Sequence, residues 1–356
     1  YENEANLVNK NKGDLIYMRK FFVYLFAFLM IFFLLPALLT NRGEVSASVK
    51  EENTSKEDNL EQENTNTEEY DYKQYGIIKL LHKSTNETEE VPLDTYLCNV
   101  VSAEMPADYE KEALKAQAIV ARTYTIYKIQ NKKHENADIC DDSSCCQAWV
   151  SKETRLSRWD EDKRESNWKK IEECVNETKG KIITYEGKPI NAFFHANSGG
   201  KTEIPVNVWG GTGYPYLQVV ETAGEEGYDQ YESEVSLTKE ELIDKLETKY
   251  SDISIDFNNQ DDIKILEYTN SGRVKTVKFG NHNLSGVEAR TLLGLRSTNF
   301  EISRDGDNIK FAVKGYGHGV GMSQTGADSL AKEGKNCFDI INHFYIGVQI
   351  TDVNSL

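Results

Sequence analysis

The stretch VPLDTYLCNVVSAEMPADYEKEALKAQAIVARTYTIY, residues 91–127, predicts two helices separated by one sharp break. Residues 91–101 predict the first helix. Pro106 prevents its continuation, because proline lacks an amide hydrogen and pushes the preceding Met105 into extended geometry. Asp108 is a good N-cap for a second helix. The inward-facing residues of that helix recur at near-helical spacing: Ala113, Ala116, Val120, Tyr124 and Tyr127.

The break places a single carboxylate, Glu104, at a helix end. Beside Met105 and Pro106, partial burial would raise its pKa. A carboxylic acid that stays protonated near neutral pH can act as a general acid. The alternative is a solvated glutamate that caps the helix or interacts with its dipole, and the short motif taken alone favours that alternative.

Charge and length narrow the classes of function. The chain has 356 residues and a formal net charge of −17, with no basic stripe. This balance argues against binding of nucleic-acid phosphates, so we expect no nucleic-acid partner. A neutral polysaccharide remains compatible with it. The first 75 residues do not look globular, which leaves residues 75–354 for the folded domain.

The N-terminal region predicts a membrane anchor. Residues 21–39 form an apolar run of 19 residues behind two basic side chains. This length spans a bilayer, and the basic flank places residues 1–20 in the cytoplasm and the rest of the chain outside the cell membrane. A cleaved signal peptide is the alternative, because Val45-Ser46-Ala47 resembles a cleavage site. Residues 40–74 predict a disordered acidic tether.

Beyond the second helix, strands and helices are interspersed without a βαβ rhythm, so we expect a mixed α+β fold. Turn residues between apolar segments predict hairpins over residues 181–195, 263–279 and 300–313. Residues 225–300 would form a second lobe inserted into the main body.

Two glycine-rich motifs carry polar side chains. HANSGG, residues 195–200, ends a predicted strand, and GYGHGVGMSQ, residues 315–324, leads into a predicted helix. Closely spaced glycines let the backbone approach a ligand, while histidine, serine and glutamine supply directional hydrogen bonds. Either motif alone could be a tight connection. Because each contains a histidine, the pair favours one shared site.

A third motif gathers soft metal ligands. One histidine and three cysteines lie within 13 residues, and imidazole with thiolates suits zinc. Adjacent cysteines do not easily enter one tetrahedron, so we expect His134, Cys140 and Cys146 to bind the metal and Cys145 to be a bystander. A Cys140–Cys146 disulfide is the alternative in an exported protein.

Several motifs together resemble the stage II sporulation protein D family, and they follow the family's order over residues 75–354. They are SAEMP at 102–106, AQAIVARTY at 116–124, SGGKTE at 198–203, LGLRSTNF at 293–300 and GHGVGMSQ at 317–324. The resemblance implies an exported, membrane-anchored enzyme that cuts peptidoglycan during engulfment of the forespore. The family's cysteine loop usually carries a histidine where this chain has Cys145.

The implied activity is that of a lytic transglycosylase on glycan strands stripped of stem peptides, with Glu104 catalytic. Glu104 would first protonate the glycosidic oxygen and then accept the proton of the C6 hydroxyl, giving a 1,6-anhydro product. The residues expected to bind sugar or orient Glu104 are Arg122, His195, Ser198, Gly199, His318, Ser323 and Gln324.

The expected partners are peptidoglycan glycan strands and other membrane-bound engulfment proteins, including a peptidoglycan amidase. Two other classes of function stay open. The chain could be a non-catalytic wall-binding protein, like the related amidase enhancers. It could also be a zinc amidase or peptidase, which fits poorly because the sequence contains no His-Glu-x-x-His motif.

Overall fold

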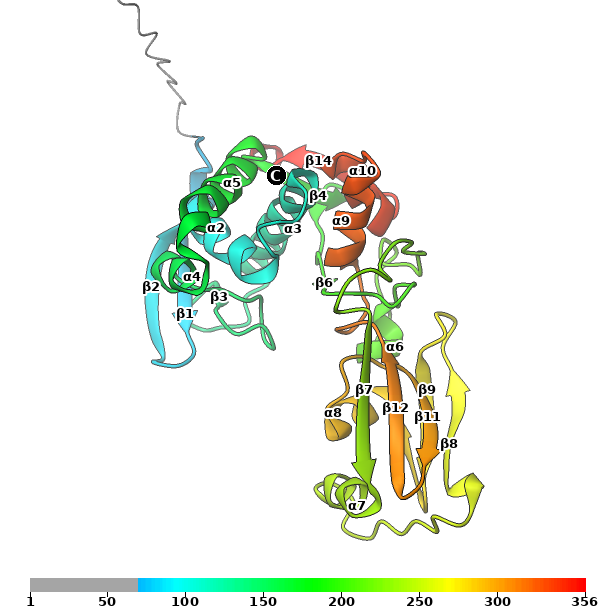
Figure 1. Cartoon of the computed structure of the whole chain (residues 1–356). Coiled ribbons are helices and arrows are strands. Elements are labelled where there is room, and N and C mark those ends of the chain that lie inside the picture. The colour runs from blue at the N-terminus through cyan, green and yellow to red at the C-terminus, as the bar shows by residue number, and fades with distance from the viewer. Residues whose placement is uncertain (1–69) are drawn as a thin grey trace, which may run out of the picture. The chain divides into compact units, whose positions relative to one another are not determined.

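A computed structural model describes residues 70–356. The expected cytoplasmic segment 1–20, the anchor 21–39 and most of the tether 40–74 lie outside these residues. Within residues 70–356, no helix is long and apolar enough to cross a bilayer. Helices and strands are interspersed along this part of the chain, which confirms the mixed α+β class (Figure 1).

The helical break falls where the sequence predicts it. Helix α2, Leu93–Glu104, ends immediately before Met105, whose backbone is extended at φ −122° and ψ 143°. Helix α3, Lys111–Gln130, begins with Glu110 rather than Asp108 at the N-cap position. Asp108 is displaced from the cap because the chain first makes a turn, closed by a hydrogen bond from the Tyr109 amide to the Pro106 carbonyl.

Helix α3 is the centre of the first lobe (Figure 1). It is buried on nearly every face rather than along one stripe, as expected for a helix covered by neighbours on all sides. Its small alanine side chains allow those neighbours to pack closely. They are α2, α5 (Arg164–Glu177), α9 (Gln324–Lys332), α10 (Cys337–Phe344) and strand β4 (Lys181–Tyr185).

Short strands and helices surround this helical core. The three sheets have the strand orders β2-β1-β3, β14-β4-β5 and β13-β6. Their remaining strands are β1 (Ile77–His82), β2 (Glu87–Pro92), β3 (Ile139–Cys140), β5 (Lys188–Pro189), β6 (Phe194–His195), β13 (Met322–Ser323) and β14 (Gln349–Asp352). The other helical segments are η1 (Lys73–Tyr75), α4 (Lys152–Arg158), η2 (Glu161–Lys163), α6 (Pro205–Trp209) and η4 (Val353–Ser355).

The hairpin expected over residues 181–195 is only partly formed. Strand β4 pairs with β5, but the chain then leaves this sheet, and β6 pairs in parallel with β13 instead. His195 is thereby aligned with Ser323. This pairing joins the two glycine-rich motifs, although more than a hundred residues separate them in the sequence.

A second lobe has its own hydrophobic core, which runs from Leu237 to Val313. Two three-stranded sheets, β11-β12-β7 and β10-β9-β8, enclose this core with two helices. The lobe extends beyond residue 300, where we expected its end, because β12 pairs with both β11 and β7. Its elements are β7 (Glu232–Thr238), α7 (Lys239–Glu247), η3 (Gln260–Asp262), β8 (Ile263–Tyr268), β9 (Val274–Phe279), β10 (His282–Ser285), α8 (Gly286–Leu293), β11 (Asn299–Asp305) and β12 (Asn308–Lys314).

Buried polar contacts join the two lobes. The Glu203 carboxylate of the first lobe accepts hydrogen bonds from the hydroxyls of Thr269 and Ser271, each at 2.6 Å. Arg273 donates from Nη2 to the Ser198 carbonyl at 2.6 Å. The second lobe is therefore fastened directly to the loop that carries the first glycine-rich motif.

Candidate active site and metal cluster

Glu104 lies at the C-terminal end of α2 and faces a cleft. The Ala148 amide donates a hydrogen bond to its Oε1 at 2.6 Å. Gln324, from the second glycine-rich motif, donates from Nε2 to Oε2 at 3.3 Å and to Gln117 Oε1 at 3.4 Å. Two segments that are distant from Glu104 in the sequence thus hold its carboxylate in place.

The surroundings of Glu104 raise the pKa of its carboxyl group toward neutral pH. Removal of water by the surrounding protein raises the pKa of Glu104 to about 7, against the smaller lowering effect of the Ala148 and Gln324 hydrogen bonds. At neutral pH the acid and the carboxylate are therefore both populated. A group in this state can give a proton in one step and take one in the next.

The cleft has a volume of about 600 Å³, which is in the usual range for ligand pockets. Among residues 70–356, Glu104 is the only carboxylate that lines it. Aromatic side chains form much of its wall, and two of them, Trp209 and Tyr316, are about half exposed. Trp209 packs against the rings of Phe193 and His318, with centroids 4.6 and 5.0 Å away. A sugar ring could stack on such a surface.

The two histidines of the glycine-rich motifs line this cleft as neutral rings. His195 donates from Nδ1 to the Val320 carbonyl at 3.1 Å, so its Nε2 carries the lone pair. Burial and the Arg273 charge lower the pKa of His195 to about 3. His318 accepts the Val320 amide at Nδ1, and burial with the neighbouring positive charges holds its pKa well below the usual range.

His195 Nε2 is buried and has no hydrogen-bond partner within the described part of the chain. A neutral imidazole nitrogen of this kind is an acceptor that suits a hydroxyl or amide donor on a ligand. Gly317 explains how the two motifs come so close. At this position φ is +115°, and a Cβ would lie 2.8 Å from the His195 Cβ.

The serines and the glycine that we expected to bind substrate lie inside the protein. Ser198 and Ser323 are fully buried and both donate hydroxyl hydrogen bonds to the buried Glu225 carboxylate. Gly199 adopts φ +68° against the backbone of Lys314, where a Cβ would approach within 2.9 Å. Their polar groups are already satisfied, so Ser198, Gly199 and Ser323 hold the two motifs together and do not line the cleft.

Arg122 is also a structural residue. Its guanidinium is completely buried and donates to the carbonyls of Thr178 and Lys181 at 2.8 and 3.2 Å. Asp94 lies 3.7 Å away as a counter-ion. These contacts fasten α3 to the chain between α5 and β4. Arg122, which we expected to bind substrate, is therefore a buried cross-link away from the cleft lining.

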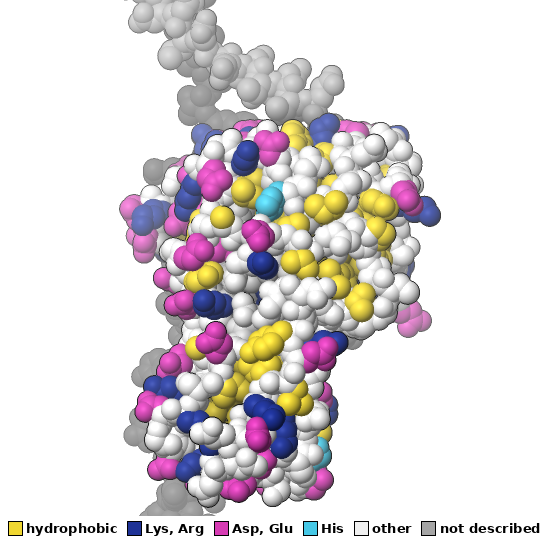
Figure 2. All heavy atoms as spheres, turned by 90° about the vertical axis from the view of Figure 1, so that its right-hand side faces the viewer, with side chains coloured by type: hydrophobic (Ala, Val, Ile, Leu, Met, Phe, Trp, Pro, Cys, Tyr) yellow, Lys and Arg dark blue, Asp and Glu magenta, His cyan; other side chains and the backbone are white. Residues whose placement is uncertain are grey.

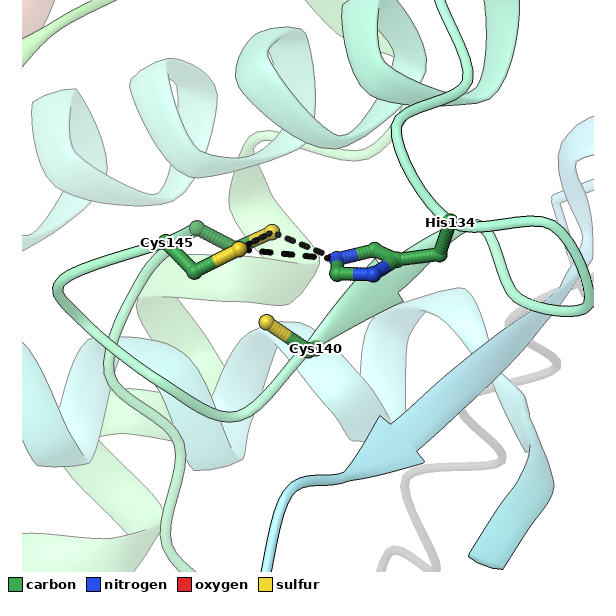
Figure 3. Close-up of side chains that lie close together, drawn as sticks. His134, Cys140 and Cys145 are labelled. Atoms are coloured by element: carbon green, nitrogen blue, oxygen red, sulfur yellow. Dashed lines mark hydrogen bonds between the residues drawn. The ribbon is translucent and has the colours of Figure 1, made fainter. Parts of the chain in front are cut away.

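The histidine and cysteines expected to bind a metal form one cluster. The imidazole Nε2 of His134 and the sulfurs of Cys140, Cys145 and Cys146 all lie within 4.8 Å of one another. Figure 3 shows His134, Cys140 and Cys145 pointing toward a common centre. His134 Nε2 is 3.7 Å from the Cys145 sulfur and 3.5 Å from the Cys146 sulfur, and these two sulfurs are 3.9 Å apart.

These separations fit one tetrahedral ion. With Zn–S bonds of about 2.3 Å, two thiolates on a tetrahedron are about 3.8 Å apart. No disulfide joins Cys140 to Cys146, since all six cysteines are free thiols. Cys145, which we expected to be a bystander, lies within the cluster together with Cys146. The turn after Asp142 brings both adjacent cysteines to the same side, because both of their amides bond to the Asp142 carbonyl.

The comparisons with known proteins agree with this architecture. A family model described as "Stage II sporulation protein" matches residues 81–185. A protein named stage II sporulation protein D from Bacillus subtilis is 33% identical over 346 residues, which cover 95% of this chain and 97% of that protein. The chain belongs to the stage II sporulation protein D family. A protein of the same name from Bacillus amyloliquefaciens is 36% identical over 78% of this chain and 79% of that protein.

Two further matches concern parts of the chain. A model of a domain of unknown function covers residues 215–321, a range that includes the whole second lobe. A Bacillus subtilis protein named amidase enhancer is 28% identical over 72% of this chain, but the match covers only 40% of that longer protein. The family is thus one of sporulation proteins, and one relative is named as an enhancer of an amidase.

Several residues of this family member's site escape prediction from sequence. Ala148 contributes only its backbone amide, which no residue type reveals. Glu225 is one acid in an acidic segment, and only the tertiary structure shows it buried between the motifs. Trp209 precedes two glycines, and that exposed aromatic turn is the one signal that could have indicated it. Arg290 sits on α8, in the lobe that we treated as separate from the site.

Proposed function

We propose that this protein is a lytic transglycosylase that cleaves the bond between N-acetylmuramic acid and N-acetylglucosamine in denuded glycan strands during engulfment. The observation that carries the proposal is Glu104. It is a single carboxylate, held by two hydrogen bonds in a sugar-sized cleft, with a pKa of about 7. The family membership supports the sporulation context.

One carboxylate is enough for this reaction because the substrate supplies its own nucleophile. Glycosidases that use water typically need two carboxyl groups, and residues 70–356 contribute one to the cleft. Protonated Glu104 gives its proton to the glycosidic oxygen as the bond from C1 to that oxygen breaks. The Glu104 carboxylate then takes the proton of the C6 hydroxyl while O6 bonds to C1. The products are a 1,6-anhydro end and a free hydroxyl.

The lining of the cleft suits a glycan strand. Trp209 and Tyr316 offer exposed rings on which pyranose faces could stack. His195 Nε2 is an acceptor without a partner among the described residues, and Gln324 lies beside Glu104. Because the His195 pKa is about 3, this ring would accept a hydrogen bond from the substrate and would not serve as a base at neutral pH.

Zinc at the cysteine cluster is part of the proposal, with a scaffolding role. His134, Cys140, Cys145 and Cys146 would hold it, and a bound ion would supply a fixed cross-link in the loop. The same loop continues to Ala148, whose amide contacts Glu104. A cross-linked loop would therefore keep this hydrogen-bond donor in place.

The decisive experiment is digestion of denuded glycan strands, with products read by mass spectrometry. Wild-type protein should release anhydro-muramic ends, and Glu104→Gln should not, while both proteins keep the same circular dichroism spectrum. Reducing ends would identify a hydrolase, and free stem peptides from intact peptidoglycan would identify an amidase. Unchanged cleavage by Glu104→Gln would remove Glu104 from the reaction.

The cellular setting remains part of the proposal as well. The apolar segment 21–39 would anchor the protein in the cell membrane, with the described lobes outside. A peptidoglycan amidase among the other engulfment proteins would prepare the substrate. Fusion of reporter enzymes before and after residues 21–39 would test this topology.

A non-catalytic role as an amidase enhancer is the second candidate, and the relative of that name favours it. In that case the cleft would bind the wall without cutting it. A reaction that combines intact peptidoglycan, an amidase and this protein separates the two functions. An enhancer would increase the release of stem peptides equally with wild type and Glu104→Gln, and anhydro ends would be absent from both reactions.

A further inference from the structure

The charge of the cleft is opposite to that of the whole chain. The chain has a formal net charge of −17, and Figure 2 shows acidic and basic side chains interspersed over one face of the molecule. The cleft, in contrast, is lined by three cations, Lys128, Lys133 and Arg290, and by the single carboxylate of Glu104. A locally positive cleft in an acidic protein indicates a ligand with negative charge.

Arg290 is the cation of this set that lacks a partner and is already partly desolvated. The neighbouring Cys145 thiol raises the pKa of Lys133, and Lys128 stands over the Tyr124 ring at 4.9 Å from its centroid. Arg290 is half-buried on α8, and no ion pair or side-chain hydrogen bond satisfies it within residues 70–356. Arg290 lines the same cleft as His195 and His318, and its positive charge lowers the pKa of both rings.

A partly buried guanidinium with free donors is a strong recognition element for a carboxylate. Its planar fork can donate two parallel hydrogen bonds to the two oxygens, and partial desolvation strengthens the attraction. Leaving such a charge without a counter-ion is costly, so a ligand carboxylate would recover that cost on binding. Arg290 shares its cleft with Glu104, so a carboxylate carried by a sugar near the scissile bond would lie in the same cleft as this guanidinium.

We propose that Arg290 is a specificity-determining residue that binds the free lactyl carboxylate of N-acetylmuramic acid. This inference rests on the proposed transglycosylase function and deepens it. The lactyl group is a three-carbon acid attached directly to the sugar ring. It is ionised only after the stem peptide has been removed, because in intact peptidoglycan it is consumed in an amide bond. Arg290 would thus select strands that an amide-hydrolysing enzyme has already processed.

A chemical double-mutant cycle tests this contact by binding alone, so it does not depend on cleavage. The full chain carrying Glu104→Gln is titrated at pH 7 against end-labelled denuded strands, read by fluorescence anisotropy. The same strands with each lactyl carboxylate converted to a methylamide provide a neutral probe of equal length. We expect neutralisation of the strand to weaken binding about ten-fold or more, the typical effect of losing one hydrogen-bonded charge.

Arg290→Gln, added to the Glu104→Gln chain, should weaken binding of the carboxylate strands by a similar factor. It should leave binding of the methylamide strands nearly unchanged, because the two changes remove the same contact. Arg290→Lys should restore part of the loss by keeping the charge without the fork. Arg158→Gln, an exposed arginine on α4, is the matched control and should bind both strands as the parent chain does.

Three results would overturn the assignment. Arg290→Gln could weaken both kinds of strand equally, which would make it a residue of general shape or stability. Lys128→Gln, and not Arg290→Gln, could weaken binding of the carboxylate strands while leaving binding of the methylamide strands unchanged. This result would assign the carboxylate contact to Lys128. Strands that keep their stem peptides could bind as tightly as denuded strands in an Arg290-dependent way, which would assign a peptide carboxylate. If Arg290→Gln does not fold, the comparison of the two strands on the parent chain still decides whether a strand carboxylate is bound.

The binding test and the cleavage test can fail separately. Selective binding of carboxylate strands without release of anhydro ends would keep the Arg290 contact and reject the transglycosylase. Release of anhydro ends with equal binding of both strands would keep the enzyme and reject the contact.

Discussion

At the scale of single residues, Glu104 combines two conditions that normally exclude each other. The surrounding protein removes water from the carboxylate, yet two hydrogen bonds stabilise its ionised form. The resulting pKa of about 7 lies between that of a buried acid and that of a solvated one. The position of the group therefore sets both the pH dependence of the proposed reaction and a part of the protein's stability.

The first prediction concerns the pH profile of glycan cleavage. The reaction starts with protonated Glu104, so kcat/KM on denuded strands should be constant below the pKa and fall about ten-fold per pH unit above pH 7. Gln324→Leu removes a hydrogen bond that lowers this pKa, so the fall should move to higher pH. Measurement from pH 5 to pH 9 checks both; a rate that rises through pH 7 would contradict the acid role.

The second prediction is that removing the charge of Glu104 stabilises the protein. The pKa is raised on folding from 4.5 to about 7, so the wild type loses stability as pH rises between these values. Above pH 7 the loss is on the order of 3 kcal/mol at most. Glu104→Gln should therefore be more stable than wild type at pH 8 and equally stable at pH 4, by urea unfolding. A variant that is no more stable at pH 8 would show that the carboxylate is well solvated.

At the scale of elements, the loop between α3 and α4 links the cysteine cluster to the site. It is irregular apart from the two-residue strand β3, yet it carries the cluster and the Ala148 amide that contacts Glu104. A loop with few backbone hydrogen bonds needs another constraint to hold a donor in place. Four soft ligand atoms within 4.8 Å can supply it.

The third prediction is that this constraint is a metal ion. Protein purified without chelator should carry about one zinc per chain, and its removal should lower the melting temperature because metal binding stabilises only the folded loop. Cys140→Ser should reduce both zinc content and melting temperature. Cys337→Ala, a buried cysteine outside the cluster, should keep its zinc and its sensitivity to chelator. If metal-free protein has the same melting temperature and the same activity as untreated protein, the ion has no role in stability or catalysis.

At the scale of the whole molecule, two hydrophobic cores are coupled through a small number of buried polar groups. Glu203 receives the hydroxyls of Thr269 and Ser271 and is almost completely buried. Arg273 reaches back from the second lobe to the Ser198 carbonyl. The cleft contains residues of both lobes, since Arg290 faces it from α8, so this coupling keeps the proposed carboxylate contact and Glu104 in one site.

The fourth prediction is that Glu203→Gln loosens the second lobe. Loss of a buried charged acceptor costs about 1–3 kcal/mol. All four tryptophans precede the second lobe, so fluorescence reports unfolding of the first lobe, while circular dichroism reports both. In the variant the urea transition by circular dichroism should separate from that by fluorescence more than in wild type. Glu226→Gln, which changes an exposed acid outside these contacts, should leave both urea transitions as in wild type. Equal behaviour of the two variants would argue against coupling through Glu203.

The sequence by itself determined the local features of this protein. Pro106 ended the helix at Glu104, the short spacing of His134, Cys140 and Cys146 indicated that these side chains cluster, and hairpins formed at the turn residues over 263–279 and 300–313. Each of these follows from interactions over a few neighbouring residues. The sequence motifs also predicted the family to which the chain belongs.

Only the tertiary structure decided which polar residues face the cleft. Ser198 and His195 are three residues apart, yet one is satisfied inside by Glu225 and the other lines the cleft. Arg122, on the central helix α3, is buried as a cross-link, while Arg290 from the other lobe is left without a partner within residues 70–356. Burial and pairing depend on contacts between distant segments, and a local pattern does not contain them. The pKa of Glu104 is of the same kind, because Ala148 and Gln324 reach it only in the folded chain.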